Sequence, residues 1–360
     1  MNPRVAVMMN KPCGKSVLKE YCKPLDEHGP SAPVCHTNPL VPAEELELHS
    51  ACSFPIQQTS NRVVKNTRRI PPRCLAFCGG GIRCVSHIGV LKSMESAGLL
   101  KFVKEMIGIS AGALFALLWV LEYSIKDIER LALELDFSVL QNIEPETALL
   151  FPLTFGLDSG EGLDKLLISV IKQKGLNPDI TFKELSKRKP IVLKCYATEL
   201  QTSSAREFSA SVSPNVMVRT AIRASMSLPI LFTPVEDPET KNLLVDGALL
   251  HNLPLVFLTE EQLKNTWGIL FMAGEERKPI GGVVDFIKFI YDGGTLMRNI
   301  TAIEKFKDKL IIINISDYSP LNFKETKEAR MKIIKQAEDA TTNYIYMKSS
   351  TRPIRRFSAC

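Results

Sequence analysis

The chain has 360 residues, of which 45% are hydrophobic and 23% are charged, and it carries a net charge of +6 at pH 7. This composition is ordinary for a globular protein that buries one large core or two modest ones. The basic residues are not interleaved with aromatic residues and no nucleic-acid-binding motif occurs, so we expect no nucleic-acid partner.

The nine cysteines are an odd number, and none of them forms a Cys-x-x-Cys pair. We therefore expect reduced thiols in a cytoplasmic protein without a zinc site or any other metal site. The first residues do not have the composition of a secretory leader. The longest uncharged stretch, residues 106–121, is too short to cross a bilayer, so we expect no transmembrane helix.

Residues 1–72 differ in composition from the rest of the chain. They are rich in proline, cysteine and polar residues, show no sustained hydrophobic period, and end at Pro71-Pro72. We expect a partly irregular N-terminal extension here and a single α/β domain over residues 73–360. Basic residues gather at 62–73 and 352–356; they either form solvated surface or attract anionic lipid headgroups.

From residue 73, short apolar runs alternate with stretches of helical period. Predicted strands span 74–78, 105–109, 191–197, 243–245, 266–272 and 310–315. Predicted helices span 85–97, 111–121, 125–135, 162–174 and 216–225. A stripe at residues 329, 333, 337, 340 and 344 indicates a last helix packed against the sheet. The alternation predicts a three-layer α/β/α fold around a mostly parallel central sheet.

The first predicted strand is followed by the glycine-rich run Gly79-Gly80-Gly81-Ile82-Arg83-Cys84. A dinucleotide-binding fingerprint would need glycine in place of Cys84 and an acidic residue at the tip of the next strand. A phosphate-binding P-loop would need Gly-Lys-Ser/Thr, which is absent. Two interpretations are left: a tight turn that packs strand against helix, and a set of bare backbone N–H donors for an oxyanion.

The next predicted strand ends in the pentapeptide Gly108-Ile109-Ser110-Ala111-Gly112. An apolar strand before it and an apolar helix after it give the setting of a Gly-x-Ser-x-Gly nucleophile elbow. The glycines permit the tight turn, and the Ser110 hydroxyl projects above the sheet at the N-terminus of a helix. With a serine one strand later, the glycine run is better interpreted as an oxyanion hole.

A serine nucleophile needs a proton acceptor. Three of the five histidines precede residue 50, and we expect His87 to be a packing or surface residue. His251 and Asp246 would complete a Ser-Asp-His order, but only five residues separate them, which makes a triad awkward. Asp246 itself ends a predicted strand, so we expect its carboxylate at the carboxyl edge of the sheet. It can act as the base if burial raises its pKa, although Asp-Gly alone is also a common hairpin signal.

The glycine run, the serine elbow and Asp246-Gly247-Ala248 together resemble the motifs of the patatin-like phospholipases. Further similar stretches lie at 156–163, 221–229 and 252–254, so the resemblance covers about residues 73–330. The resemblance implies that Ser110 is the nucleophile and Asp246 the sole base of a dyad. It also implies an oxyanion hole in the loop from Gly79 to Arg83, formed by the amides around Gly80, Gly81 and Ile82, with Arg83 orienting the loop. Cys84 departs from the family's final glycine, and we expect tighter packing there rather than lost chemistry.

The resemblance further implies a calcium-independent acyl-ester hydrolase of the phospholipase A or lysophospholipase type. Its substrates would be phospholipids or related glycerolipids, and it would need no cofactor. We expect such an enzyme to associate peripherally with membranes, helped by the basic stretches and by apolar residues near the cleft. Two alternatives stay open. One is an acyltransferase or neutral-lipid lipase that uses the same dyad, and the other is a non-catalytic lipid-binding scaffold.

Overall fold

The structure, a computed structural model, describes residues 71–140, 143, 145–272, 280–315, 318 and 324–350. The chain divides into two units, Met1–Val63 and Val64–Cys360, and all described residues belong to the second unit. The predicted N-terminal extension lies outside the described residues except for Pro71 and Pro72. Its boundary with the α/β domain therefore stays a prediction.

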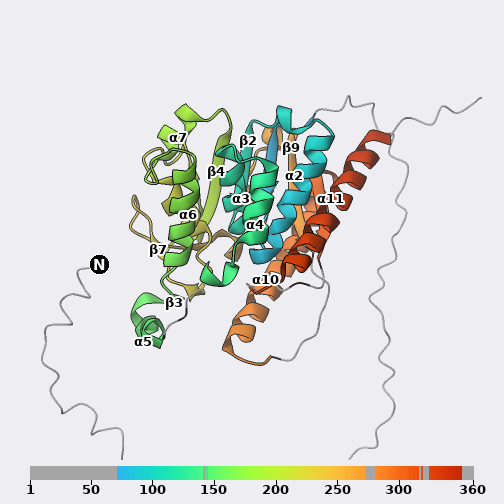
Figure 1. Cartoon of the computed structure of the whole chain (residues 1–360). Helices are drawn as coiled ribbons and strands as arrows, with labels where there is room; N and C mark the ends of the chain where they lie inside the picture. The colour runs from blue at the N-terminus through green and yellow to red at the C-terminus, as the bar shows by residue number, and fades with distance from the viewer. Residues whose placement is uncertain are drawn as a thin grey trace, which may run out of the picture. The chain divides into compact units, whose positions relative to one another are not determined.

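An eight-stranded sheet forms the centre of the described part of the chain (Figure 1). Its strands are β1 (Cys74–Phe77), β2 (Glu105–Ile109), β4 (Val192–Glu199), β5 (Ser204–Ser209), β7 (Val235–Glu236), β8 (Leu243–Asp246), β9 (Thr266–Met272) and β10 (Leu310–Asn314). The spatial order is β10-β9-β1-β2-β4-β8-β7, and β5 also pairs with β4. The strands from β10 to β4 are parallel to one another, whereas β5 and β8 run antiparallel to β4.

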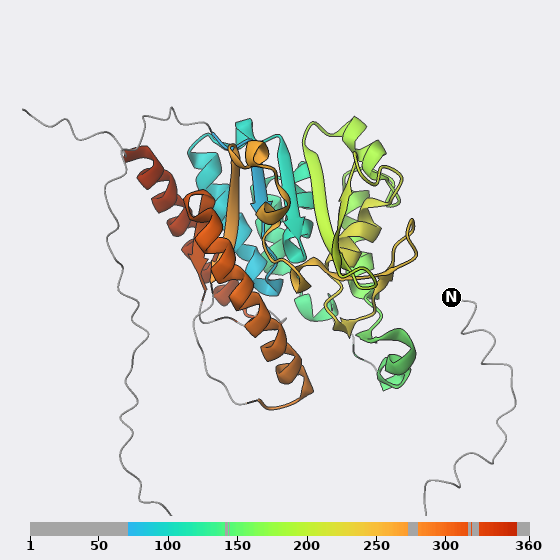
Figure 2. The ribbon, with the colours of Figure 1, turned by 180° about the vertical axis from the view of Figure 1, so that it is seen from behind.

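Helices lie on both faces of this sheet. The described helices are α2 (Ser86–Ser96), α3 (Ala111–Val120), α4 (Ile125–Glu134), α5 (Pro145–Thr154), α6 (Glu161–Gln173), α7 (Phe182–Arg188), α8 (Val218–Ser225), α9 (Glu260–Leu263), α10 (Val283–Phe306) and α11 (Lys327–Ser350). Figure 1 shows α2, α3, α4 and α6 in front of the sheet, and Figure 2 shows α10 on the opposite side. The predicted three-layer α/β/α fold with a mostly parallel sheet is confirmed.

The predicted strands and helices match the structure to within a few residues at their ends. Residues 105–109 form β2, and the predicted helix over 111–121 is α3. The sequence analysis did not predict α5, α7, α9, α10, β5, β7 or the small parallel sheet of β3 (Gly156–Asp158) and β6 (Ile230–Phe232). Gly293-Gly294 interrupts the apolar pattern of α10, and Pro152 lies inside α5, so neither shows a clear helical period.

Helix α3 forms the centre of the core and determines where Ser110 lies. It is apolar on every side, and a helix of this kind can be stable only when it is buried all round. Ala113, Ala116 and Leu117 are completely buried, as are Ile107 and Ile109 of the preceding strand. The N-terminus of α3 is therefore fixed rigidly at the carboxyl edge of the sheet.

The C-terminal helix packs against the sheet at β10, as predicted, and more extensively against α2. The expected stripe is present, with Ile333 and Ala337 fully buried. The two helices approach at Gly89 of α2, and the Ser93 hydroxyl donates to the Glu338 carbonyl at 2.7 Å. Within the described residues, no helix combines the length and the apolar composition that a bilayer span requires.

The contact between α2 and α11 makes Gly89 sensitive to substitution. A Cβ at this position would lie 2.1 Å from the Ile334 carbonyl oxygen and 2.6 Å from the Glu338 nitrogen, so α11 would have to move. We expect Gly89→Ala to lower the free energy of unfolding by about 2 kcal/mol, measured by chemical denaturation. Gly293→Ala is the control, because no atom lies within 4 Å of its Cβ position. Equal stability of the two variants would contradict this account of the helix contact.

Candidate active site

Ser110 lies in a strained turn between β2 and α3. Its backbone has φ 53° and ψ −135°, a conformation that non-glycine residues rarely adopt. Strain of this kind costs on the order of 1–3 kcal/mol and is typical of a nucleophile elbow. The turn is held in place by Ser225, whose hydroxyl accepts from the Ser110 N–H at 2.9 Å and donates to the Tyr196 carbonyl at 2.6 Å.

The two elbow glycines lie where side chains would collide with backbone. A Cβ at Gly112 would be 2.4 Å from the Cys78 carbonyl oxygen, and one at Gly108 would be 2.4 Å from the Ala113 Cα. The absence of side chains lets the first turn of α3 pack directly on the end of β1. Ser110 is thereby brought beside the glycine loop that follows β1.

Asp246 lies at the carboxyl edge of the sheet, as expected. It arrives there on β8, which runs antiparallel to its neighbour β4. Strand β4 extends past the end of β2, where Ile109 pairs with Tyr196, and Asp246 pairs with the next residue, Ala197. The end of β8 therefore meets the end of β2 at one level of the sheet.

The two side chains form a direct hydrogen bond. Ser110 Oγ donates to Asp246 Oδ2 at 2.6 Å. The other carboxylate oxygen, Oδ1, accepts from the Ala248 N–H at 2.8 Å and from the Tyr291 hydroxyl at 3.3 Å. Asp246 is only 1% exposed, and this burial raises the pKa of its carboxyl to about 6, against the three donors, which lower it. The group is thus charged at neutral pH yet more basic than an ordinary aspartate.

Contacts of its backbone to the loop after α8 and to β4 also fix the aspartate. The Asp246 N–H donates to the Ser227 carbonyl at 2.8 Å, and the Thr198 hydroxyl donates to the Asp246 carbonyl at 3.0 Å. After Asp246 the chain turns through the 3₁₀ segment Gly247–Leu249. Gly247 lies against the Tyr196 carbonyl, and Ala248 is buried at the cleft.

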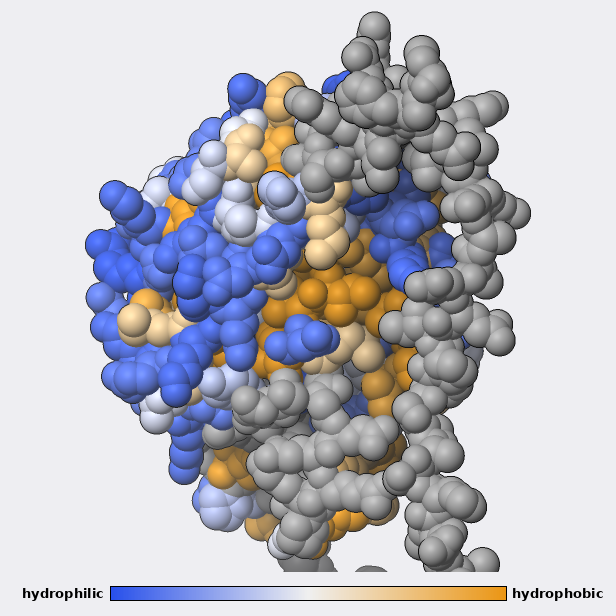
Figure 3. All heavy atoms as spheres, turned by 90° about the vertical axis from the view of Figure 1, so that its right-hand side faces the viewer, coloured by the Kyte–Doolittle hydropathy of each residue, from blue (hydrophilic) through white to orange (hydrophobic). Residues whose placement is uncertain are grey.

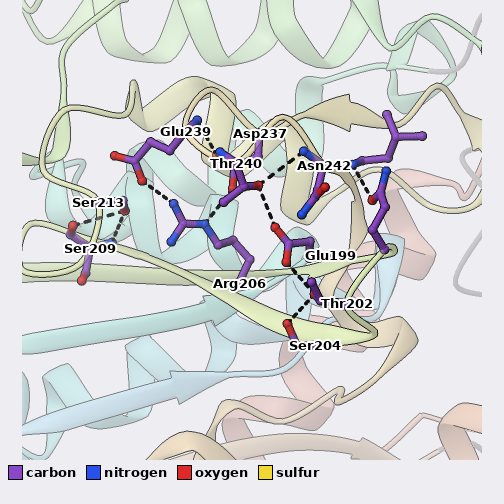
Figure 4. Close-up of polar contacts among 12 residues, drawn as sticks. Glu199, Thr202, Ser204, Arg206, Ser209, Ser213, Asp237, Glu239, Thr240 and Asn242 are labelled. Atoms are coloured by element: carbon purple, nitrogen blue, oxygen red, sulfur yellow. Dashed lines mark hydrogen bonds and ion pairs between the residues drawn. The ribbon is translucent and has the colours of Figure 1, made fainter.

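A polar network anchors the hairpin that leads into β8 (Figure 4). Arg206 of β5 pairs with the fully buried Asp237 carboxylate at 2.7 Å and also with Glu239. The Glu199 carboxylate accepts from the Thr240 hydroxyl at 2.7 Å. These bonds join β4, β5 and the β7–β8 hairpin, so the start of the aspartate-bearing strand is held as firmly as its end.

The glycine loop passes directly beside the serine. A Cβ at Gly79 would lie 2.8 Å from the Ser110 Cβ, so only glycine allows this approach. Gly79, Gly80, Gly81, Ile82 and Arg83 line one cleft together with Ser110 and Asp246. The loop enters the 3₁₀ turn Gly81–Val85, and Arg83 Nε donates to the Tyr318 carbonyl at 2.6 Å. Cys84 is fully buried, with its Sγ 3.7 Å from the Cys78 carbonyl, which agrees with the expected packing role.

The histidines near the site do not contact the serine or the aspartate in the described structure. His87 is buried and stacks on Phe77 with ring centroids 4.2 Å apart, and burial lowers its pKa to about 3. It is a packing residue, as expected. His251 is exposed and lies edge-on to Phe257. Among the described residues, no group of three or more His, Cys, Asp or Glu is arranged to hold a metal ion.

The cleft is lined by apolar and polar side chains. Its apolar lining includes Leu114, Phe115, Phe137, Leu140, Leu163, Met226, Leu228 and Phe232. The polar lining includes Tyr291 and Asn299 of α10, which the sequence analysis did not identify because it did not predict that helix. Asn252 Nδ2 donates to Asn299 Oδ1 at 3.3 Å, and Asn299 Nδ2 donates to the Phe271 carbonyl at 3.1 Å, which ties α10 to the site.

Fold and site together define a class of protein. It is a three-layer α/β/α protein with a serine at a strained strand-to-helix turn, bonded directly to a buried aspartate beside a glycine loop. The family model for patatin-like phospholipase matches residues 75–258. The chain belongs to the patatin-like phospholipase family, and this membership supports lipid hydrolase activity.

Similar proteins come from several kinds of organism. The uncharacterized protein R571 of Acanthamoeba polyphaga mimivirus is 28% identical over 262 residues, which cover 69% of this chain and 85% of that protein. Human patatin-like phospholipase domain-containing protein 6 is 29% identical over 180 residues, covering 50% of this chain and 12% of the human protein. The crystal structure of VipD from Legionella pneumophila aligns with a TM-score of 0.50 at 16% identity, covering 77% of this chain and 67% of VipD, which shows a shared fold.

Burial of the Asp246 carboxyl has a consequence for stability. Its pKa rises from 3.8 to about 6, so the native state binds this proton more tightly than the unfolded chain does. Ionisation of the buried carboxyl therefore lowers the free energy of unfolding. This decrease is absent below both pKa values and grows to about 3 kcal/mol as the pH rises through 6. We expect Asp246→Asn to raise the free energy of unfolding by up to this amount near pH 8, and by less near pH 5. A gain of equal size at both pH values would contradict the raised pKa.

Proposed function

We propose that this protein is a lipid acyl-ester hydrolase of the phospholipase A or lysophospholipase type, with Ser110 as nucleophile and Asp246 as general base. The observation that carries the proposal is the 2.6 Å hydrogen bond between the serine hydroxyl and a buried carboxylate at the base of a largely apolar cleft. The apolar lining offers a fatty acyl chain an environment without water. Membership of the patatin-like phospholipase family supports the same substrate class.

The reaction proceeds in two steps. Asp246 accepts the Ser110 proton as the oxygen attacks the ester carbonyl, and the bond to the leaving alcohol breaks after that alcohol receives the proton. Water then attacks the acyl-serine with Asp246 again as the base, and the acyl–Oγ bond breaks as Ser110 regains a proton from Asp246, which releases the fatty acid. In both steps, backbone N–H groups of the loop around Gly80, Gly81 and Ile82 stabilise the negative charge on the carbonyl oxygen. The dyad generates the nucleophile without a metal ion, so we propose that the hydrolysis does not depend on calcium.

Removal of either dyad residue tests the proposal. We expect Ser110→Ala and Asp246→Asn each to reduce fatty-acid release from phospholipid vesicles by about a thousandfold or more, while wild-type release persists in excess EDTA. Ser186→Ala, on an exposed part of α7, is the control and should retain full activity. Wild-type protein should be labelled at Ser110 by a fluorophosphonate, whereas the alanine variant should not. Undiminished release by either dyad variant refutes the mechanism, and transfer of the acyl group to an added alcohol in preference to water would assign a transferase.

The hydroxyl of Tyr291 gives a second test through the pH dependence. Asp246 must be charged to act as a base, so kcat/KM should fall as the pH drops below its raised pKa of about 6. Tyr291 donates to the carboxylate and favours its charged form. Tyr291→Phe should therefore shift the acidic limb of the kcat/KM pH profile to higher pH, by about half a pH unit to one unit. In Tyr196→Phe, which loses a hydroxyl bonded to Glu207, the limb should not move. A Tyr291 variant that is slower at every pH with an unmoved limb would show that Tyr291 does not act through the carboxylate.

A further inference from the structure

Two walls of the cleft carry exposed apolar side chains on their outer sides. The first wall is the segment from Phe137 through α5 to β3, together with β6, and it contributes Leu140 and Phe232 to the cleft. The second wall is α10, which contributes Tyr291 and Thr295. We call their exposed apolar residues the apolar rim; it includes Leu149, Leu153 and Phe155 of the first wall and Phe286, Ile290 and Met297 of the second.

Both walls project at the same end of the second unit. Figures 1 and 2 show α5 and the N-terminal end of α10 extending beyond the sheet on the same side. Figure 3, which shows the right-hand side of Figure 1, has its broadest hydrophobic surface in the middle of this face and smaller hydrophobic areas at its lower end. The two walls that carry the apolar rim therefore project at one end of the second unit.

The rim residues are much more exposed than is usual for large apolar side chains. Leu149 is 81% exposed, Leu153 60%, Ile290 62% and Met297 63%. An apolar surface of this kind beside a ligand cleft is typical of an interaction site. The backbone also holds two such side chains outward at a cost: Phe155 has φ 57° and Ile230 of β6 has φ 70°, and both are exposed. Positive φ is a rare conformation, especially for a β-branched residue such as isoleucine.

The charges of α5 and of the rim stretch of α10 nearly cancel, which favours a neutral partner: the rim stretch of α10 carries two acidic and two basic residues, Asp285, Asp292, Lys288 and Arg298. Glu146 is the one ionisable residue among the ten of α5. The described basic residues Arg73 and Lys348 lie at the other end of the strands. Arg73 precedes β1, at the edge of the sheet opposite Ser110, and Lys348 Nζ of α11 donates to the carbonyl of Asp308, just before β10. Attraction to anionic headgroups through these two residues would not bring the cleft to the lipid.

We propose that the apolar rim inserts into the surface of a zwitterionic phospholipid bilayer, so that an acyl chain passes from the lipid into the cleft without crossing water. This inference rests on the proposed function for the reason why the cleft must face lipid. Helix α5, with ten residues, is about 15 Å long, too short to span a bilayer but long enough to lie in its interface. The rim thus supplies apolar area for shallow insertion, and binding needs no anionic lipid.

Flotation with phosphatidylcholine vesicles tests the proposal in full-length protein carrying Ser110→Ala, which leaves the vesicles intact. We expect this protein to bind, and binding to persist at about 1 M NaCl, where ionic attraction is screened. The double substitutions Leu149→Glu/Leu153→Glu and Ile290→Glu/Met297→Glu should each weaken binding by about tenfold or more, because burying one leucine contributes at least that factor. The control, Val192→Glu/Val212→Glu, changes exposed residues near the opposite edge of the sheet and should bind as well as its parent.

Hydrolysis of a soluble short-chain ester separates this proposal from the proposed function. When they are made without the Ser110→Ala substitution, both rim variants should keep the ester hydrolysis and thermal stability of the wild type but lose activity on vesicles. Wild-type protein that binds vesicles but hydrolyses no ester would refute the proposed function and leave the rim in place. Three results would contradict insertion of the rim: unchanged vesicle binding by both rim variants, an equal loss of binding in the control, or binding only to anionic vesicles at low salt. A dimer that the rim variants dissociate, without vesicle binding by the parent, would assign the surface to a second copy instead.

Discussion

The hydrogen bond between a serine hydroxyl and an almost completely buried carboxylate is the interaction on which the rest of the site depends. A charged group in such a position is unfavourable unless donors surround it, and Asp246 receives donors from Ser110, Ala248 and Tyr291. These three hydrogen bonds keep the carboxylate charged near neutral pH, while burial keeps its pKa above that of an ordinary aspartate. Water has little access to the carboxylate, because Asp246 is only 1% exposed.

The sheet brings Ser110 and Asp246 together because it combines parallel and antiparallel strands. The parallel strands bring the glycine loop and Ser110 to one edge, as in other parallel α/β sheets. Strand β4 then extends beyond its parallel neighbour β2 and offers its end to the antiparallel β8. The buried Arg206–Asp237 pair fixes the hairpin before β8. The site therefore requires both a rigid parallel core and a well-anchored antiparallel addition.

The sequence predicted the parallel core well, because each strand and helix there has a clear hydrophobic period. The run over 105–109 and the apolar helix after Ser110 leave little ambiguity, and the three motifs gave the family correctly. Proximity of Ser110 and Asp246 could be expected, but the antiparallel entry of β8 could not, since a four-residue strand carries no sign of its direction. Helix α10 escaped prediction because of its paired glycines, and with it the contact of Tyr291 to the carboxylate. Long-range contacts of this kind have no local signal in a single sequence.

The positions of Ser225 and Ser227 have a mechanical consequence. The last residue of α8 holds the backbone N–H of Ser110, and the loop residue two places later holds that of Asp246. Ser110 and Asp246 are thus held by the same short segment, although 136 positions separate them along the chain. A movement of this segment carries both residues with it, so the distance between the serine hydroxyl and the carboxylate is preserved.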